Sequence, residues 1–155
     1  MRRIHAVELE DLPWVPAAVR DGGTDALHVG FSRLRFYDGV AGALLDFVAR
    51  SGHRRVVDLC SGGGGGTLDV LQRLGAHLGP LELVLTDLHP SETARARLAA
   101  QATGGLQVRY ADQPLDALAD DREDPGVRTM ASALHHFRPE QVARLVAARV
   151  AAGQP

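Results

Sequence analysis

The chain has 155 residues, 45% of them hydrophobic and 23% charged, a balance that is ordinary for a single globular domain. Its formal net charge of -2 gives no electrostatic attraction to nucleic acid or to an anionic membrane, and no apolar run approaches the roughly 20 residues that cross a bilayer. A single cysteine, Cys60, excludes an intramolecular disulfide and is typical of a reducing compartment, so we expect a cytoplasmic protein.

Residues 1–53 are predicted to form an N-terminal helical region ahead of a main domain at residues 54–155. Asp21-Gly22-Gly23 is typical of a turn. In residues 37–50 apolar side chains recur at helical spacing, and Ser51-Gly52 follows as a stop signal. We therefore expect a helix there that ends at this pair.

From residue 54 onward, short apolar runs alternate with helical patterns. The predicted strands lie at residues 56–59, 81–85, 106–110 and 127–131, and the last predicted helix begins at Pro139. The third strand alternates apolar and polar residues, which fits the edge of a sheet. Residues 112–126 are predicted to form a loop with one short helical turn. Strands separated by crossover helices indicate an α/β protein with a doubly wound, Rossmann-like parallel sheet.

Five consecutive glycines, residues 62–66, join the first predicted strand to the helix after it. Glycine permits a positive φ and carries no Cβ, so a ligand can contact the backbone directly. The following helix offers unpaired N–H groups to a carboxylate or phosphate. A flexible linker is the alternative interpretation. A dinucleotide site would need glycines at positions 1, 3 and 6, but Gly62 and Gly64 are followed by Thr67.

The segment Asp58-Leu59-Cys60-Ser61-Gly62-Gly63-Gly64 resembles motif I of class I S-adenosylmethionine-dependent methyltransferases, an acidic residue followed by a glycine-rich turn. Cys60 stands where the first of three spaced glycines is found in the family, whereas Gly62 and Gly64 match the other two. The resemblance covers about residues 35–150. It implies that Asp58, Cys60, Gly62 and Gly64 contribute to the cofactor site.

Two further acidic residues agree with this family. Asp87, which ends the second predicted strand, resembles the family residue that binds the ribose hydroxyls, and a carboxylate can accept two hydrogen bonds from a diol. Leu88 beside it is assigned to the same cofactor site. Asp112, after the third strand, resembles the family contact to the adenine amino group. The alternatives are that Asp87 starts a turn or caps a helix, and that Asp112 is a solvated loop residue.

The segment at residues 132–137 resembles the stretch of small-molecule methyltransferases that faces the methionine part of the cofactor and the substrate. It implies a cofactor contact from Ser132 and makes His135 and His136 candidate general bases, because histidine titrates near neutrality. We expect the two histidines to point apart and predict no metal site. We expect the N-terminal region to form a lid over the cofactor. In this lid, Tyr37 would offer an aromatic face to the sulfonium cation.

The resemblance implies a methyltransferase that uses S-adenosyl-L-methionine and acts on a small-molecule acceptor. A non-catalytic S-adenosylmethionine-binding or regulatory remnant is the alternative, and an NAD-dependent oxidoreductase is disfavoured by Thr67 and by the Leu-His-His segment. Family members continue with a fifth strand, a helix and a hairpin. We therefore expect a truncated domain with strand order 3-2-1-4, whose catalytic activity is an open question. We also expect the domain to self-associate through the exposed edge of strand four.

Overall fold

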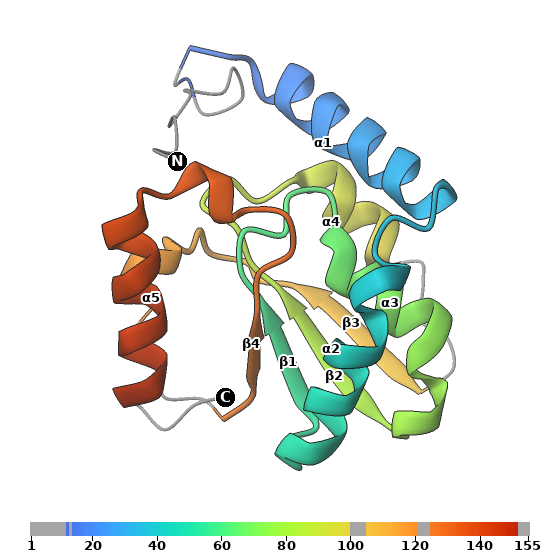
Figure 1. Cartoon of the computed structure of the whole chain (residues 1–155). Helices are drawn as coiled ribbons and strands as arrows, with labels where there is room; N and C mark the ends of the chain where they lie inside the picture. The colour runs from blue at the N-terminus through green and yellow to red at the C-terminus, as the bar shows by residue number, and fades with distance from the viewer. Residues whose placement is uncertain (1–11, 13, 100–104, 121–124, 152–155) are drawn as a thin grey trace.

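A computed structural model describes residues 12, 14–99, 105–120 and 125–151 of the chain. Four parallel strands form one sheet in the order β3-β2-β1-β4, which confirms the predicted α/β class and strand order (Figure 1). The strands are β1 (Arg55–Asp58), β2 (Leu81–Leu85), β3 (Leu106–Tyr110) and β4 (Val127–Thr129).

Five α-helices surround the sheet in the described part of the chain. They are α1 (Ala17–Arg33), α2 (Asp38–Ser51), α3 (Gly65–Leu74), α4 (Glu92–Ala99) and α5 (Pro139–Ala151). Short 3₁₀ helices follow α3 or lie in loops, namely η2 (Gly75–Leu78), η3 (Ala117–Ala119) and η4 (Leu134–His136).

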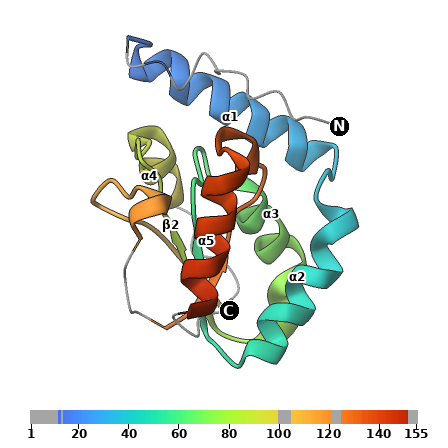
Figure 2. The ribbon, with the colours of Figure 1, turned by 60° about the vertical axis from the view of Figure 1, so that its left-hand side comes forward.

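Both faces of the sheet are covered. Val56 of β1 and Leu83 of β2 belong to the core shared with α2, α3 and α4, whereas Val57 and Val84 belong to a second core shared with Leu145 of α5. Successive residues of a strand point to opposite faces, so these continuous apolar runs are buried on both sides. Figures 1 and 2 show α5 on one side of the sheet and α2 and α3 on the other.

Several predicted boundaries are confirmed. Helix α2 ends at Ser51, and Gly52 follows it with a left-handed φ of 71°. The third strand lies at the edge of the sheet, and η3 is the predicted short helical turn. Strand β4 lies at the opposite edge, and the self-association expected there stays a prediction.

The turn predicted at Asp21-Gly22-Gly23 is wrong, because α1 runs through all three residues. Each glycine weakens a helix by about 1 kcal/mol relative to alanine, so contacts elsewhere must hold α1 in place. One is a 2.6 Å hydrogen bond from the Ser32 hydroxyl to Asp69 of α3. Tertiary packing has therefore overridden a local turn signal.

The end of the described chain also differs from expectation. Strand β4 stops at Thr129, two residues before the predicted end. Of the apolar stripe predicted on α5, Leu145 is buried, but Val146 and Val150 are 58% and 73% exposed. The helix-capping glycine predicted at residue 153 lies outside the described residues.

Helix α1 crosses over the carboxyl ends of the strands, where the loops after β1, β2 and β4 meet (Figure 1). These ends are the usual ligand-binding edge of an open α/β sheet. None of the described helices combines the length and the apolar character needed to cross a membrane.

Candidate functional site

The loop between β1 and α3 adopts a left-handed backbone at several positions. Positive φ angles occur at Cys60 (56°), Gly62 (50°), Gly64 (128°) and Gly65 (64°). Glycine adopts these angles without steric cost, whereas Cys60 carries a penalty of about 1–2 kcal/mol. The structure thus gives Cys60 a backbone that suits glycine, at the position where the resembled motif has one.

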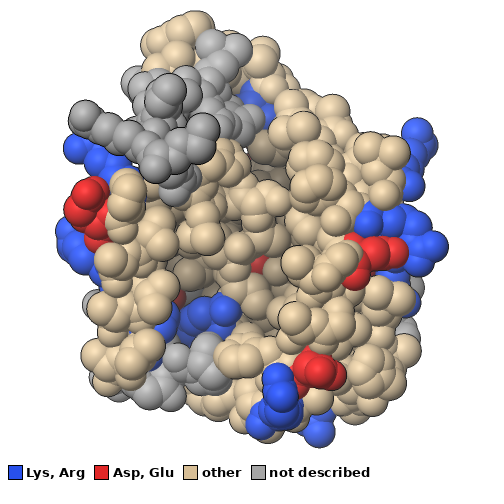
Figure 3. All heavy atoms as spheres, viewed as in Figure 1, with Lys and Arg blue, Asp and Glu red and all other residues tan. Residues whose placement is uncertain are grey.

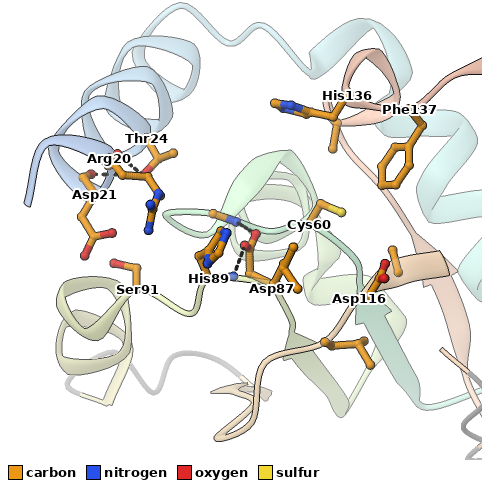
Figure 4. A pocket seen from close by; sticks show the side chains of 15 residues that line it. Arg20, Asp21, Thr24, Cys60, Asp87, His89, Ser91, Asp116, His136 and Phe137 are labelled. Atoms are coloured by element: carbon orange, nitrogen blue, oxygen red, sulfur yellow. Dashed lines mark hydrogen bonds between the residues drawn. The ribbon is translucent and has the colours of Figure 1, made fainter. Parts of the chain in front are cut away.

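Gly62 is held by Asp87, which follows β2, and by Tyr110 at the end of β3. Its N–H donates to Oδ2 of Asp87 at 2.9 Å, and its carbonyl accepts from the hydroxyl of Tyr110 at 2.9 Å. The other Asp87 oxygen accepts from the backbone N–H of His89 at 2.9 Å (Figure 4). Asp87 therefore fixes the glycine loop and also organises the turn after β2.

Asp58 lies beneath the glycine loop and is only 1% exposed. Its carboxylate accepts hydrogen bonds from the hydroxyls of Thr67 at 2.6 Å, Thr129 at 2.7 Å and Ser61 at 2.9 Å. Burial raises the pKa of this carboxyl to about 6, although the three hydroxyl donors lower it. Asp58 supports the loop from below and lines neither cavity described next.

Helix α1 packs directly onto the glycine loop. A Cβ on Gly63 would lie 2.7 Å from Oδ1 of Asp25 in α1. Arg97 of α4 joins the two, because it pairs with Asp25 at 3.0 Å and donates to the Gly63 carbonyl. Part of the glycine run is therefore required by the protein's own packing rather than by a ligand.

Tyr37 makes a second contact of this kind. A Cβ on Gly66 would lie 2.5 Å from the Tyr37 ring, and the Tyr37 hydroxyl is 3.0 Å from Oγ of Ser132. The N-terminal region is thereby connected to the loop after β4 across the start of α3.

Two cavities meet over the glycine loop. The first, which we call the acidic cavity, has a volume of about 350 Å³ (Figure 4). Its lining consists of Arg20, Asp21, Thr24, Cys60, Gly62, Asp87, Leu88, His89, Ser91, Leu115, Asp116, Ala117, Ala133, His136 and Phe137.

The second, which we call the aromatic cavity, has a volume of about 450 Å³. Its lining consists of Thr24, Leu27, His28, Phe31, Phe36, Tyr37, Cys60, Ser61, Gly62, Gly63, Gly65, Ala131, Ser132, Ala133, His135 and His136. The two cavities share Thr24, Cys60, Gly62, Ala133 and His136, so together they form one cleft roofed by α1.

The structure brings most of the predicted site residues to this cleft. Those that line the acidic cavity are Cys60, Gly62, Asp87, Leu88 and His136. Tyr37, Ser132 and His135 line the aromatic cavity. Gly64 lines neither cavity, and a Cβ there would lie 2.9 Å from the Leu68 side chain.

Asp112 also lies away from both cavities. It is exposed, and its backbone carbonyl accepts from Arg95 at 3.4 Å. Asp116 lines the acidic cavity instead, and its side chain caps η3 by accepting from the N–H of Leu118 at 2.9 Å. An aspartate at the start of the predicted helical turn is an N-cap signal, and that signal could have identified Asp116 from the sequence.

His135 and His136 do not point apart. Their ring centroids are 4.2 Å from each other, with 36° between the ring planes. The expected divergence assumes a strand or a continuous helix, whereas these residues end a single 3₁₀ turn that passes directly into extended backbone at Phe137. The described residues contain no group of three or more metal-ligating side chains.

The sequence predicts an N-terminal helical lid, but the α1 residues that line the cleft were missed because a turn was predicted within α1. Arg20, Thr24, His28 and Phe31 recur at spacings of four, four and three residues, which places them on one helix face. All four line the cleft. This spacing is the signal that could have found them.

Comparison of this chain with protein-family models, curated proteins and solved structures finds no match. A functional assignment therefore depends on the cleft itself. On the face seen in Figure 3, blue arginine side chains lie in separate groups and form no continuous basic surface.

Proposed function

We propose that this protein is an S-adenosylmethionine-dependent methyltransferase with a Rossmann-like, doubly wound domain and a small-molecule acceptor. Asp87 carries the proposal. Its carboxylate stands at the carboxyl end of β2, is bonded to the glycine loop, and lines the acidic cavity. That position suits recognition of a ribose diol by the carboxylate.

The cleft has the capacity for such a ligand. The two cavities, of about 350 and 450 Å³, each fall within the range of roughly 300–1,000 Å³ that is usual for small-molecule sites. An ionised carboxylate offers about four acceptor positions, and backbone N–H groups occupy two of those on Asp87. The remaining positions can accept hydrogen bonds from two hydroxyls.

A dinucleotide fits the same loop poorly. Asp25 places a carboxylate against Gly63, and Asp87 places another against Gly62. Arg97 neutralises Asp25, so the obstacle to a pyrophosphate is that Asp87 already accepts the N–H of Gly62, one of the loop N–H groups on which pyrophosphate binding depends. Thr67, at the position of the third dinucleotide glycine, is buried and bonded to Asp58.

Residues of the two cavities would bind different parts of the cofactor. The acidic cavity would hold the adenosine part, with Asp87 on the ribose and Asp116 near the base. The aromatic cavity would hold the amino-acid part near Gly63, Gly65 and Ser132, with Tyr37 beside the cation. S-adenosylmethionine supplies a methyl group already activated by its sulfonium, so the protein mainly has to orient the acceptor.

A binding or regulatory protein without turnover is the remaining alternative for the same cleft. Both proposals require S-adenosylmethionine to bind, and they differ only in the methyl transfer. Transfer of a labelled methyl group to any acceptor would exclude the binding-only alternative.

The proposal is tested by calorimetric titration of the full chain with S-adenosylmethionine and, separately, with NAD. We expect S-adenosylmethionine to bind and Asp87→Ala to weaken that binding about 10- to 100-fold, as the loss of one charge-assisted hydrogen-bonding group predicts. Asp112→Asn, an exposed aspartate outside both cavities, is the matched control and should leave affinity unchanged. Tighter binding of NAD than of S-adenosylmethionine would overturn the proposal.

A further inference from the structure

Charged side chains are distributed unequally between the two cavities. The acidic cavity contains Arg20 and the carboxylates of Asp21, Asp87 and Asp116. Among the described residues that line the aromatic cavity there is no aspartate, glutamate, lysine or arginine. No lining side chain offers a counter-ion to an acceptor bound there beside the cofactor, so the aromatic cavity favours a neutral or weakly acidic acceptor over a cationic amine.

Aromatic rings build one wall of this cavity. The rings of Phe31 and Phe36 stack with centroids 4.7 Å apart, and Tyr37 meets Phe31 edge-on at 6.0 Å and Phe36 at 5.3 Å. Such a wall favours a planar aromatic guest, because ring pairs contribute about 0.5–1.5 kcal/mol beyond the area that they bury.

His28 of α1 lines the same cavity, half-buried, with its Cε1 near the glycine loop at Gly64. Among the described residues, no group forms a hydrogen bond with its ring. Its charged neighbours are Asp25 on α1, Asp69 on α3 and Arg97 on α4. Burial, followed by the Arg97 charge, lowers the pKa of His28 below 6.5, so the imidazole is neutral at pH 7 and one ring nitrogen can accept a proton.

We infer that the acceptor is a planar phenol-like hydroxyl compound bound in the aromatic cavity, and that His28 accepts the hydrogen bond, and then the proton, of its hydroxyl group. This inference rests on the proposed methyltransferase function for its biological meaning. The proton leaves the O–H bond for a ring nitrogen of His28, and the bonding electron pair remains on oxygen. The resulting oxyanion is the nucleophile that an activated methyl group requires, and His28 returns the proton to water.

His135 and His136 share the cavity, but their rings contact each other. We assign both histidines to the wall of the aromatic cavity. His28 differs from these two histidines because it lies on α1, the helix that roofs the cleft, on the same face as Thr24 and Phe31.

The test compares two probes and two proteins without any methyl donor present. Binding of 4-nitrophenol and of its methyl ether, 4-nitroanisole, is measured by calorimetry with the unmodified chain and with His28→Phe. We expect the unmodified chain to prefer the phenol about 10-fold, the value of one hydrogen bond to a partly buried acceptor, and His28→Phe to lose that preference. His77→Phe is the matched control, because His77 is exposed in η2 and lines neither cavity.

The same samples give two further readouts. The imidazole C–H resonance of His28 should shift with 4-nitrophenol and not with 4-nitroanisole. Benzylamine, a cation of similar size, should bind more weakly than either probe. If His28→Phe fails to fold in a thermal melt, His28→Ala replaces it.

An equal preference in the unmodified and His28→Phe proteins, tighter binding of benzylamine, or no binding of any probe would each overturn the inference. These outcomes are independent of the proposed function, which is tested by S-adenosylmethionine calorimetry without acceptor. Binding of S-adenosylmethionine without phenol preference leaves the methyltransferase proposal standing. Phenol preference without S-adenosylmethionine binding overturns only the methyltransferase proposal.

Discussion

Asp58 is a carboxyl that the fold removes from water and surrounds with hydroxyl donors. Burial raises the pKa of this group from 3.8 to about 6, so the native state takes up its proton more readily than the unfolded chain. The stabilising effect of that proton is complete below about pH 4 and is lost as the pH rises through 6. At one pKa unit per 1.4 kcal/mol, ionised Asp58 costs up to about 3 kcal/mol at pH 7.

Asp58→Asn should therefore stabilise the protein at pH 7 by about 1–3 kcal/mol and bring no gain at pH 4. The asparagine oxygen can keep the donors Thr67 and Thr129, and its amide group can donate to Ser61. Urea denaturation of both proteins at pH 4, 5.5 and 7 measures the difference. Asp112→Asn, at an exposed aspartate, should follow the unmodified chain at every pH. A constant loss of stability in Asp58→Asn would mean that the hydroxyl network requires the ionised carboxylate.

At the scale of elements, the contact between the start of α3 and the ring of Tyr37 depends on the absence of a side chain at Gly66. A Cβ there would lie 2.5 Å from ring atoms that are buried and tethered through the Tyr37 hydroxyl to Ser132. Gly66→Ala should destabilise the fold by about 1–3 kcal/mol, the usual cost of overpacking. Chemical denaturation measures this loss.

Gly42 in α2 provides the matched control, because it is exposed and nothing lies within 4 Å of its Cβ position. Gly42→Ala should stabilise the protein by about 0.4–1 kcal/mol through the reduced entropy of the unfolded chain. Equal effects of the two substitutions would show that the Tyr37 ring moves aside without loss of folding stability.

The elements that sequence patterns predict well are those whose local signals agree with their packing. The central strands are continuous apolar runs, and the helix-stop signal after α2 coincides with a left-handed Gly52. The prediction failed in α1, where Asp21-Gly22-Gly23 is a turn signal locally and a helix in the fold. What holds α1 helical is distant in sequence, namely the loop beneath Asp25 and the Asp69 partner of Ser32.

Contacts between residues that are far apart in sequence also limit prediction of the candidate site. Asp87 could be placed from the sequence because it ends a strand next to the glycine loop, and every parallel strand ends at the same edge of the sheet. Local signals, a helical spacing and an N-cap, single out His28 and Asp116, but whether these residues reach the cleft depends on how α1 and η3 pack onto that edge. Asp112 was chosen for its place after β3, but the chain carries it away from the cavity that Asp116 reaches.

At the scale of the whole molecule, the cleft joins segments from most of the chain, from Arg20 in α1 to Phe137 after η4. A ligand that contacts all of them binds the folded chain and not the unfolded one. S-adenosylmethionine at 100 times its dissociation constant should therefore raise stability by about 2.7 kcal/mol, or about 5–11 °C in melting temperature for a domain of this size.

Thermal melts with increasing S-adenosylmethionine measure this shift. It should grow with the logarithm of the ligand concentration and fall to about 0.4–1.4 kcal/mol at the same ligand concentration in Asp87→Ala, whereas NAD should leave the melting temperature unchanged. His28→Phe should retain the full shift, because His28 is assigned to the acceptor and not to the cofactor. A shift reduced equally in both variants would mean that S-adenosylmethionine contacts His28 as well as Asp87. The assignment of His28 to the acceptor would then be wrong.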